Sequence, residues 1–163
     1  MKKIIFVLLI GIVGCTSQKT TVETSPLSQE DFLQCPFGFL ENIKNFSELK
    51  SPKFHVQKLL RKNKHYPSKT DTIYQFTYKN SEVFFYKTHN GKEFLLAGKI
   101  VNKQIELKND IHVGISKEDF INRFSEDLQI NSDSLQMVGD GTKYTFVFDK
   151  KKLKRIHIDN YFD

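Results

Sequence analysis

Apolar and polar residues alternate strictly in two stretches of the chain, a pattern that predicts β-strands with one buried face. Each stretch passes through a short polar turn into a second strand. The alternating apolar positions are aromatic in both stretches. They are Tyr74, Phe76 and Tyr78 in the first stretch and Tyr144, Phe146 and Phe148 in the second. We expect these side chains to be buried under helices, because such strands are more often core than binding patch. Burial would leave the opposite strand face as the interaction surface.

Shorter apolar runs and turn dipeptides complete the predicted sheet. Further strands are expected at residues 53–60, 93–101, 103–107 and 133–138. Asn90-Gly91 and Asp140-Gly141 are typical of tight hairpin turns, which need residues that tolerate a positive φ. Together these signals predict an antiparallel meander.

Two octapeptides match each other closely: "LSQEDFLQ" at 27–34 and "ISKEDFIN" at 115–122. Each places a serine, Ser28 or Ser116, where its hydroxyl would cap the first turn of a helix. An aspartate follows three residues later, and apolar residues flank the cap as a hydrophobic staple. Both octapeptides therefore predict helix starts.

The extents of these helices follow from the apolar residues beyond them. The first helix is expected to break at Pro36 and to resume from Gly38 to Phe46, and the second to continue to about Asp127 or Leu128. The fold class predicted for residues 28–163 is α+β, with helices packed on an antiparallel β-meander sheet.

Two explanations of the matching octapeptides stay open. One is an internal duplication, with tandem helix-plus-sheet repeats at 28–107 and 115–163. The other is that capping and hairpin chemistry recur in unrelated segments because the physics is common.

The first fifteen residues differ sharply from the rest. Lys2 and Lys3 precede an apolar run at 4–13, which ends at Gly14 and Cys15. A helix that crosses a bilayer needs about 20 apolar residues, so this run is only half as long as a span requires. The pattern predicts a secretory signal rather than a membrane helix.

The motif Ile12-Val13-Gly14-Cys15 resembles the lipobox of bacterial lipoprotein precursors. The resemblance implies that residues 1–14 are a signal peptide cleaved between Gly14 and Cys15, and that Cys15 is lipidated and binds the membrane. Residues 16–27 are polar and predict a flexible tether with a reach on the order of 20 Å. The expected location is the bacterial cell envelope, where the protein is anchored by its lipid in the outer membrane and faces the periplasm or the cell surface.

Two other interpretations of Cys15 stay open. It could pair with Cys35 in a disulfide of a simple secreted protein, or it could be a core thiol. If Cys15 is lipidated, it has no thiol left for a disulfide, and Cys35 is then expected to be a lone buried thiol.

The charge is mildly basic. The 163 residues include 25 Lys and Arg and 19 Asp and Glu, a net charge of +6, which falls to +4 without Lys2 and Lys3. The densest basic run, at 150–155, is interpreted as a solvated hairpin turn rather than a surface for nucleic acid or lipid headgroups. We therefore expect no nucleic acid partner.

No stretch of the chain carries a catalytic or metal-binding motif. The histidines lack metal-ligand spacing; they are His55, His65, His89, His112 and His157. His89 precedes a turn and is expected to face solvent, while the capping role explains Ser116. The sequence thus predicts neither an enzyme nor a cofactor nor a metal site.

The segment "GISKEDF", followed by "YTFVFDKKKLKRI", resembles the repeat of small envelope proteins with the β-lactamase-inhibitor-protein-like fold. The small lipoprotein subunit of the outer-membrane β-barrel assembly machinery has a comparable unit. The resemblance implies helices on an antiparallel sheet that acts as a binding surface. The hypothesis is a lipid-anchored interaction module that docks an envelope protein. The alternatives are a small-ligand carrier or enzyme with a site not visible in the sequence, and a largely structural lipoprotein.

Overall fold

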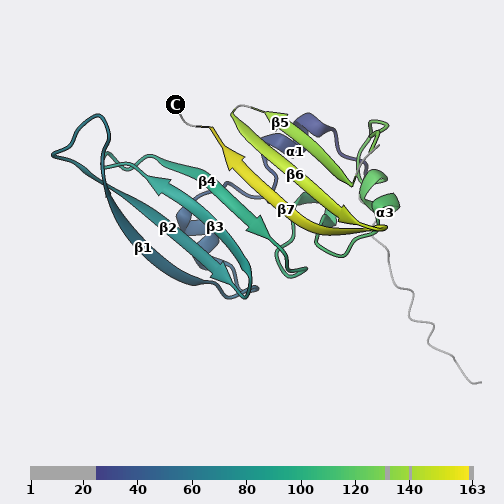
Figure 1. Cartoon of the computed structure of the whole chain (residues 1–163), viewed down its shortest axis with the longest axis horizontal. Helices are drawn as coiled ribbons and strands as arrows, with labels where there is room; N and C mark the ends of the chain where they lie inside the picture. The colour runs from purple at the N-terminus through teal and green to yellow at the C-terminus, as the bar shows by residue number, and fades with distance from the viewer. Residues whose placement is uncertain (1–24, 131–132, 140, 162–163) are drawn as a thin grey trace, which may run out of the picture.

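An antiparallel sheet of seven strands organises the part of the chain that this computed structural model describes, residues 25–130, 133–139 and 141–161. The strand order is β1-β2-β3-β4-β7-β6-β5 (Figure 1). The strands are β1 (His55–Lys62), β2 (Thr70–Tyr78), β3 (Ser81–Lys87), β4 (Glu93–Ile100), β5 (Ser134–Gly139), β6 (Thr142–Asp149) and β7 (Lys152–Asn160). Two meanders, β1 to β4 and β5 to β7, therefore meet at the pairing of β4 with β7.

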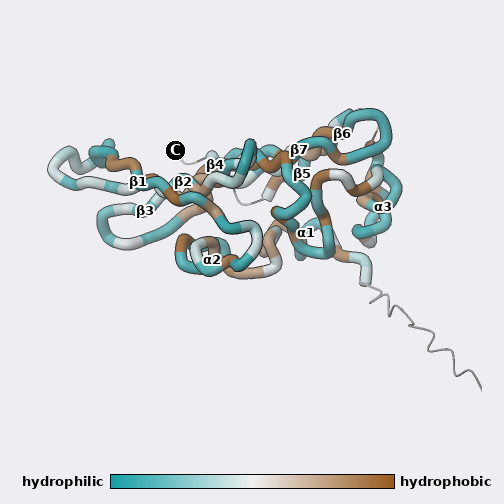
Figure 2. The backbone as a smooth tube through the Cα atoms, turned by 90° about the horizontal axis from the view of Figure 1, so that it is seen from below, coloured by the Kyte–Doolittle hydropathy of each residue, from teal (hydrophilic) through white to brown (hydrophobic). Residues whose placement is uncertain are grey.

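Within these residues three short α-helices lie on one side of the sheet (Figure 2). They are α1 (Gln29–Gln34), α2 (Ile43–Glu48) and α3 (Lys117–Ile121). The predicted antiparallel sheet is confirmed, but the helical share of the fold is smaller than the α+β prediction implied. None of the helices in the described residues is long and apolar enough to cross a membrane.

Both predicted helix caps are present. The Ser28 hydroxyl accepts a hydrogen bond from the Asp31 N–H at 3.0 Å, and the Ser116 hydroxyl accepts one from the Asp119 N–H at 2.9 Å. Each serine in turn donates its O–H to the aspartate carboxylate. A cap of this kind contributes about 1 kcal/mol. Helices of five or six residues are unstable alone, so packing against the sheet must supply the rest.

The second predicted helix ends seven residues early, at Ile121 rather than Leu128. The backbone that follows pairs with the N-terminal segment: Leu27 donates its N–H to the Arg123 carbonyl at 2.9 Å and accepts the Ser125 N–H at 3.0 Å. These bonds take the place of further helical bonds. Leu128 is nevertheless buried, so the apolar periodicity predicted burial correctly and the helix length wrongly.

The predicted continuation of the first helix from Gly38 is also wrong. Gly38 has a φ of +74°, outside the helical range, and α2 begins only at Ile43. Asn42 caps this helix by accepting the Asn45 N–H at 2.7 Å. A second acceptor comes from β4, where the Glu93 carboxylate accepts the Ile43 N–H at 3.0 Å. The sheet thus helps to decide where α2 starts.

The strand predicted at 103–107 does not form. Asn102 turns the chain after β4 by donating its side-chain N–H groups to the Tyr78 carbonyl and the Ser81 hydroxyl. Ile105 and Leu107 then pack into the core, which is why the run is apolar. The other three predicted strands match β1, β4 and β5 to within two residues.

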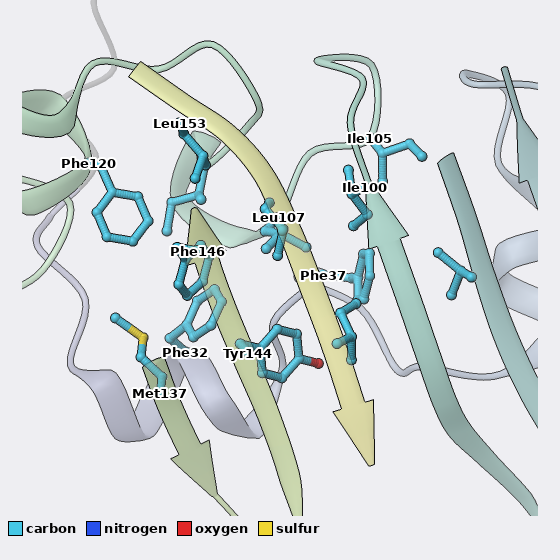
Figure 3. Packing of buried hydrophobic residues seen from close by; sticks show 14 of the residues in the cluster. Phe32, Phe37, Ile100, Ile105, Leu107, Phe120, Met137, Tyr144, Phe146 and Leu153 are labelled. Atoms are coloured by element: carbon cyan, nitrogen blue, oxygen red, sulfur yellow. The ribbon is translucent and has the colours of Figure 1, made fainter. Parts of the chain in front are cut away.

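The helix-covered face of the sheet holds the aromatic core. Phe76, Tyr144, Phe146 and Phe148 are buried as predicted, whereas Tyr74 and Tyr78 are partly exposed. Phe32 of α1 lies with its ring centroid 5.6 Å from that of Tyr144 and 5.9 Å from that of Phe146. Figure 3 shows these rings as one packed group. This face is filled by the protein's own side chains.

A matched pair of Leu→Ala variants tests this assignment of the core. Leu153 of β7 is 1% exposed, and Leu60 of β1 is 77% exposed. Leu153→Ala should lower the free energy of unfolding by about 2–5 kcal/mol, because it leaves a cavity. Leu60→Ala should change it by less than about 0.5 kcal/mol. Urea unfolding followed by circular dichroism measures both values, and equal losses would contradict the core described above.

Candidate functional site

The face of the sheet that the helices leave uncovered carries an apolar row across its first meander. Ile73 of β2 lies opposite Tyr86 of β3, which lies opposite Phe94 of β4. All three side chains are partly exposed. In the second meander the same face is mainly polar, with Thr145 of β6 opposite His157 of β7. We call this surface the helix-free face.

A buried carboxylate lies at one end of the apolar row. Asp71, at the start of β2, is 0% exposed. Its Oδ2 accepts the Asn63 side-chain N–H at 2.7 Å and the Tyr86 hydroxyl, and its Oδ1 accepts the His89 backbone N–H at 2.7 Å. The Tyr86 hydrogen bond is the strongest of the effects that hold the pKa of Asp71 below its ordinary value. The same bond raises the pKa of Tyr86.

Asp71 joins two turns that lie far apart in the sequence. Asn63 begins the connection from β1 to β2, and its side-chain oxygen accepts the His65 and Tyr66 backbone N–H groups at 2.9 and 2.8 Å. His89 lies in the turn between β3 and β4. Its ring packs edge-on against the Tyr66 ring, with the two ring centroids 5.9 Å apart. A fully bonded buried network of this kind fixes the geometry of both turns. His89 is exposed, as expected, and its backbone N–H and ring also hold the two turns together.

A hollow of about 390 Å³ opens beside this network. Its volume falls within the range of small-ligand pockets. Three basic or protonatable side chains and an apolar group of Tyr86, Phe94 and Leu96 contribute to its lining. The complete lining is Arg61, Asn63, Lys64, His65, Tyr86, Thr88, Phe94 and Leu96. The arrangement suits an anionic group attached to an apolar body.

Positive charge is concentrated around this end of the sheet. Residues 53–92, which form β1 to β3 and their turns, contain nine Lys and Arg and two Asp and Glu, a net charge of +7. Since the whole chain has a net charge of +6, the remainder carries −1. The excess of positive charge therefore lies outside the basic run at 150–155, and a charge count by segment reveals it. We call residues 53–92 the basic end.

The N-terminal segment joins the fold far from the basic end. Ser25 accepts a hydrogen bond from the Asn109 side chain, and Leu27 pairs with Arg123 and Phe124 just after α3. Figure 1 shows α3 beside β6 and β7, whereas β1 is the opposite edge of the sheet. At about 4.8 Å per strand spacing, the two sheet edges are roughly 30 Å apart.

Of the residues that the sequence singled out, some lie outside the part of the chain that the structure describes and others within it. Gly14 and Cys15, the predicted cleavage and lipidation residues, lie outside the described residues, and so does any pairing of Cys15 with Cys35. Cys35 itself follows α1, forms no disulfide within the described residues, and is partly exposed, not buried as expected. Ser116 caps α3, as predicted.

A separate titratable group lies on the helix-covered side. Burial raises the pKa of Glu41 to about 7, although a hydrogen bond from the Phe37 backbone lowers it. Burial also raises the pKa of Tyr144, and the charges of Glu41 and Cys35 raise it further. Among the described residues, the Glu41 Oε1 atom is buried without a hydrogen-bond partner.

The described residues include no group of three or more His, Cys, Asp and Glu side chains placed to hold a metal ion. No protein-family model matches the chain, and no curated protein or solved structure matches it either. The function is therefore inferred from the contacts, burial and charges of the chain's own residues.

The raised pKa of Glu41 predicts how stability depends on pH. The unfolded chain releases this proton near pH 4.3, whereas the folded protein keeps it to about pH 7. Protonated Glu41 therefore contributes fully to the free energy of unfolding below about pH 4, and this contribution is lost as the pH rises through 7. Glu41→Gln should remove the loss and stabilise the protein at pH 8 by about 3 kcal/mol relative to wild type.

Urea unfolding at pH 5, 6, 7 and 8 measures this dependence. The matched control is Glu48→Gln, because Glu48 is exposed at the end of α2. The control should follow the wild-type profile. A Glu41→Gln protein whose profile also parallels wild type would show that Glu41 titrates in its ordinary range.

Proposed function

We propose that the protein is a lipid-anchored binding module of the bacterial cell envelope, which holds an acidic partner protein at the basic end of its sheet. The observation that carries this proposal is the separation of charge from attachment. The net charge of +7 lies in residues 53–92, and the N-terminal segment joins the fold beside α3, across the sheet. A lipid on Cys15 would therefore leave the basic end free to meet a partner.

The side chains of the basic end are available for this role. Eight of its nine cations are exposed, namely Lys53, Lys58, Arg61, Lys62, Lys64, Lys69, Lys79 and Lys92. Charges of one sign on an exposed surface speed the encounter with an oppositely charged protein and disfavour other partners. The apolar row on the helix-free face, next to these cations, supplies contact area of the kind enriched in interfaces.

The hollow beside Asp71 favours a second candidate function, the binding of a small anionic ligand. Arg61, Lys64 and His65 would receive the anion, and Tyr86 and Phe94 would contact its apolar part. Binding rather than catalysis is proposed in both cases, because the hydrogen bonds of Asp71 and Tyr86 are used to fix the two turns.

The finer description of the fold as two helix-plus-sheet repeats also belongs with the proposals. Its support is the shared geometry of the two caps, with φ and ψ of −70° and 153° at Ser28 and −67° and 154° at Ser116. The last strands of the two meanders, β4 and β7, pair antiparallel. A duplicated unit related by a twofold axis through this pairing would give that arrangement.

The lipid anchor is tested at Cys15. Cys15→Ala should abolish incorporation of radiolabelled fatty acid and prevent cleavage after Gly14, so that the precursor accumulates. Cys35→Ala is the matched control, because it removes the other cysteine of the chain, and it should be labelled and processed like wild type. A Cys15→Ala protein that is still labelled would contradict the anchor.

The acidic partner is tested by reversing charge at two places. Lys58→Glu with Lys62→Glu changes the basic end, and Lys151→Glu with Lys152→Glu makes the same change of charge at the β6–β7 turn. Cross-linking in cells and mass spectrometry should recover an acidic protein with wild type and with the second double variant. Its yield should fall about tenfold or more with the first, because like charges would then face each other.

Three results would count against the partner proposal. Equal yields from both double variants would show that the basic end is not the contact. Recovery of nucleic acid in place of protein would identify another class of partner. Background yields from all three proteins would favour the small-ligand function.

A further inference from the structure

The two edges of the sheet differ in how they are protected. The edge strand β5 is six residues long, and α1 packs on its helix-covered face, where a Cβ at Gly139 would lie 3.1 Å from Leu33 Cδ1. The β1 edge is eight residues long, and every residue in it is exposed. Figure 2 shows the helices grouped beneath the other strands, with α2 under the sheet inward of β1. A helix thus partly buries the short edge strand β5 from one face, whereas the β1 edge, in which every residue is exposed, is open.

The open edge presents backbone groups that can pair with another strand. All eight residues of β1 are in register with β2, from His55 opposite Thr77 to Lys62 opposite Thr70. An antiparallel strand directs half of its N–H and C=O groups toward each side, so β1 has a full row of groups facing away from β2. Such a row is a template for an added strand.

The side chains of β1 combine apolar and cationic positions. Val56 and Leu60 share a face with Lys58, and they are 38% and 77% exposed. Leu59 is on the other face with Arg61 and is 40% exposed. Lysines on an edge strand deter self-association. Three exposed apolar residues on the same strand do the opposite, so protection alone does not explain this composition.

The cations of β1 indicate which kind of strand could pair with this edge. Lys58, Arg61 and Lys62 form no salt bridge within the described residues; the Lys58 ammonium instead lies 5.3 Å from the centroid of the Tyr74 ring. A second copy of the chain would bring three cations against three cations. An extended segment with acidic side chains would neutralise them, and its apolar side chains would cover Val56, Leu59 and Leu60.

We propose that β1 accepts an extended, acidic segment of the partner protein as an eighth strand of the sheet. This inference rests on the proposed function and specifies how the partner binds. Backbone pairing along eight residues supplies the common contact, and the cations and apolar side chains, which occur on both faces of β1, select the sequence.

The experiment uses the full-length protein in detergent and a synthetic ten-residue peptide that alternates Glu with Val. Hydrogen exchange should slow at residues 55–62 when the peptide binds. Binding should weaken about tenfold or more with Lys58→Glu and Lys62→Glu, and stay unchanged with Lys151→Glu and Lys152→Glu.

Two N-methylated peptides separate strand pairing from simple charge attraction. One is methylated at its odd positions and the other at its even positions, so that only one of them loses the N–H groups that would face β1. Strand addition requires that one peptide binds much more weakly than the other. Equal affinity of the two peptides would overturn the proposal, because attraction between side-chain charges does not depend on which backbone N–H groups are methylated.

The remaining outcomes separate this inference from the proposed function. If exchange slows at residues 63–69 and 86–96 but not in β1, the acidic ligand occupies the hollow and strand addition is wrong. If the peptide does not bind while capture in cells still depends on Lys58 and Lys62, strand addition is wrong and the acidic partner stands. Slowed exchange in β1 that depends on protein concentration without peptide would identify a second copy as the occupant.

Discussion

The pairing of β4 with β7 makes one sheet out of two meanders. Four residue pairs form the junction, from Ala97 opposite Asp159 to Ile100 opposite Ile156. At its centre Gly98 faces Ile158, and a Cβ on Gly98 would lie 3.0 Å from Ile158 Cδ1. The missing side chain lets Ile158 fill the space between the strands, so the core continues from one meander to the other. Without this junction the short helices would have two small sheets to cover, each with too little core.

The continuous sheet explains why the two faces differ. Helices of five or six residues contribute few buried side chains, so apolar side chains of the strands, aromatic and aliphatic, supply most of the core. Phe32 and Phe46 each anchor one helix in that core, Phe32 against Tyr144 and Phe46 against Phe85 at 4.8 Å. Since all three helices lie on one side, the other face depends on its own side chains for cover. That is where the buried Asp71 network and the hollow lie.

The sequence predicted the local elements well where local chemistry decides them. The caps at Ser28 and Ser116 and the turn at Gly91, which has a φ of +87°, depend on side chains and backbone close in sequence. It failed where distant segments decide: α3 stops because Leu27 pairs with the chain beyond it. The Asp71 network also joins distant segments: the hydrogen bond from the His89 N–H to Asp71 spans 18 residues, and no local pattern indicates it. A charge count by segment would have revealed the basic end.

The lysines of β1 reconcile two requirements that conflict on most edge strands. An open edge with exposed Leu59 and Leu60 invites pairing with any extended chain, including another copy of itself. Positive charge along the strand suppresses pairing with neutral or basic segments, and a second copy is as basic as the first. The same charge attracts an acidic strand, because neutralisation removes the repulsion that otherwise keeps the edge free. Selectivity at this edge therefore comes from repulsion of the wrong partners as much as from attraction of the right one.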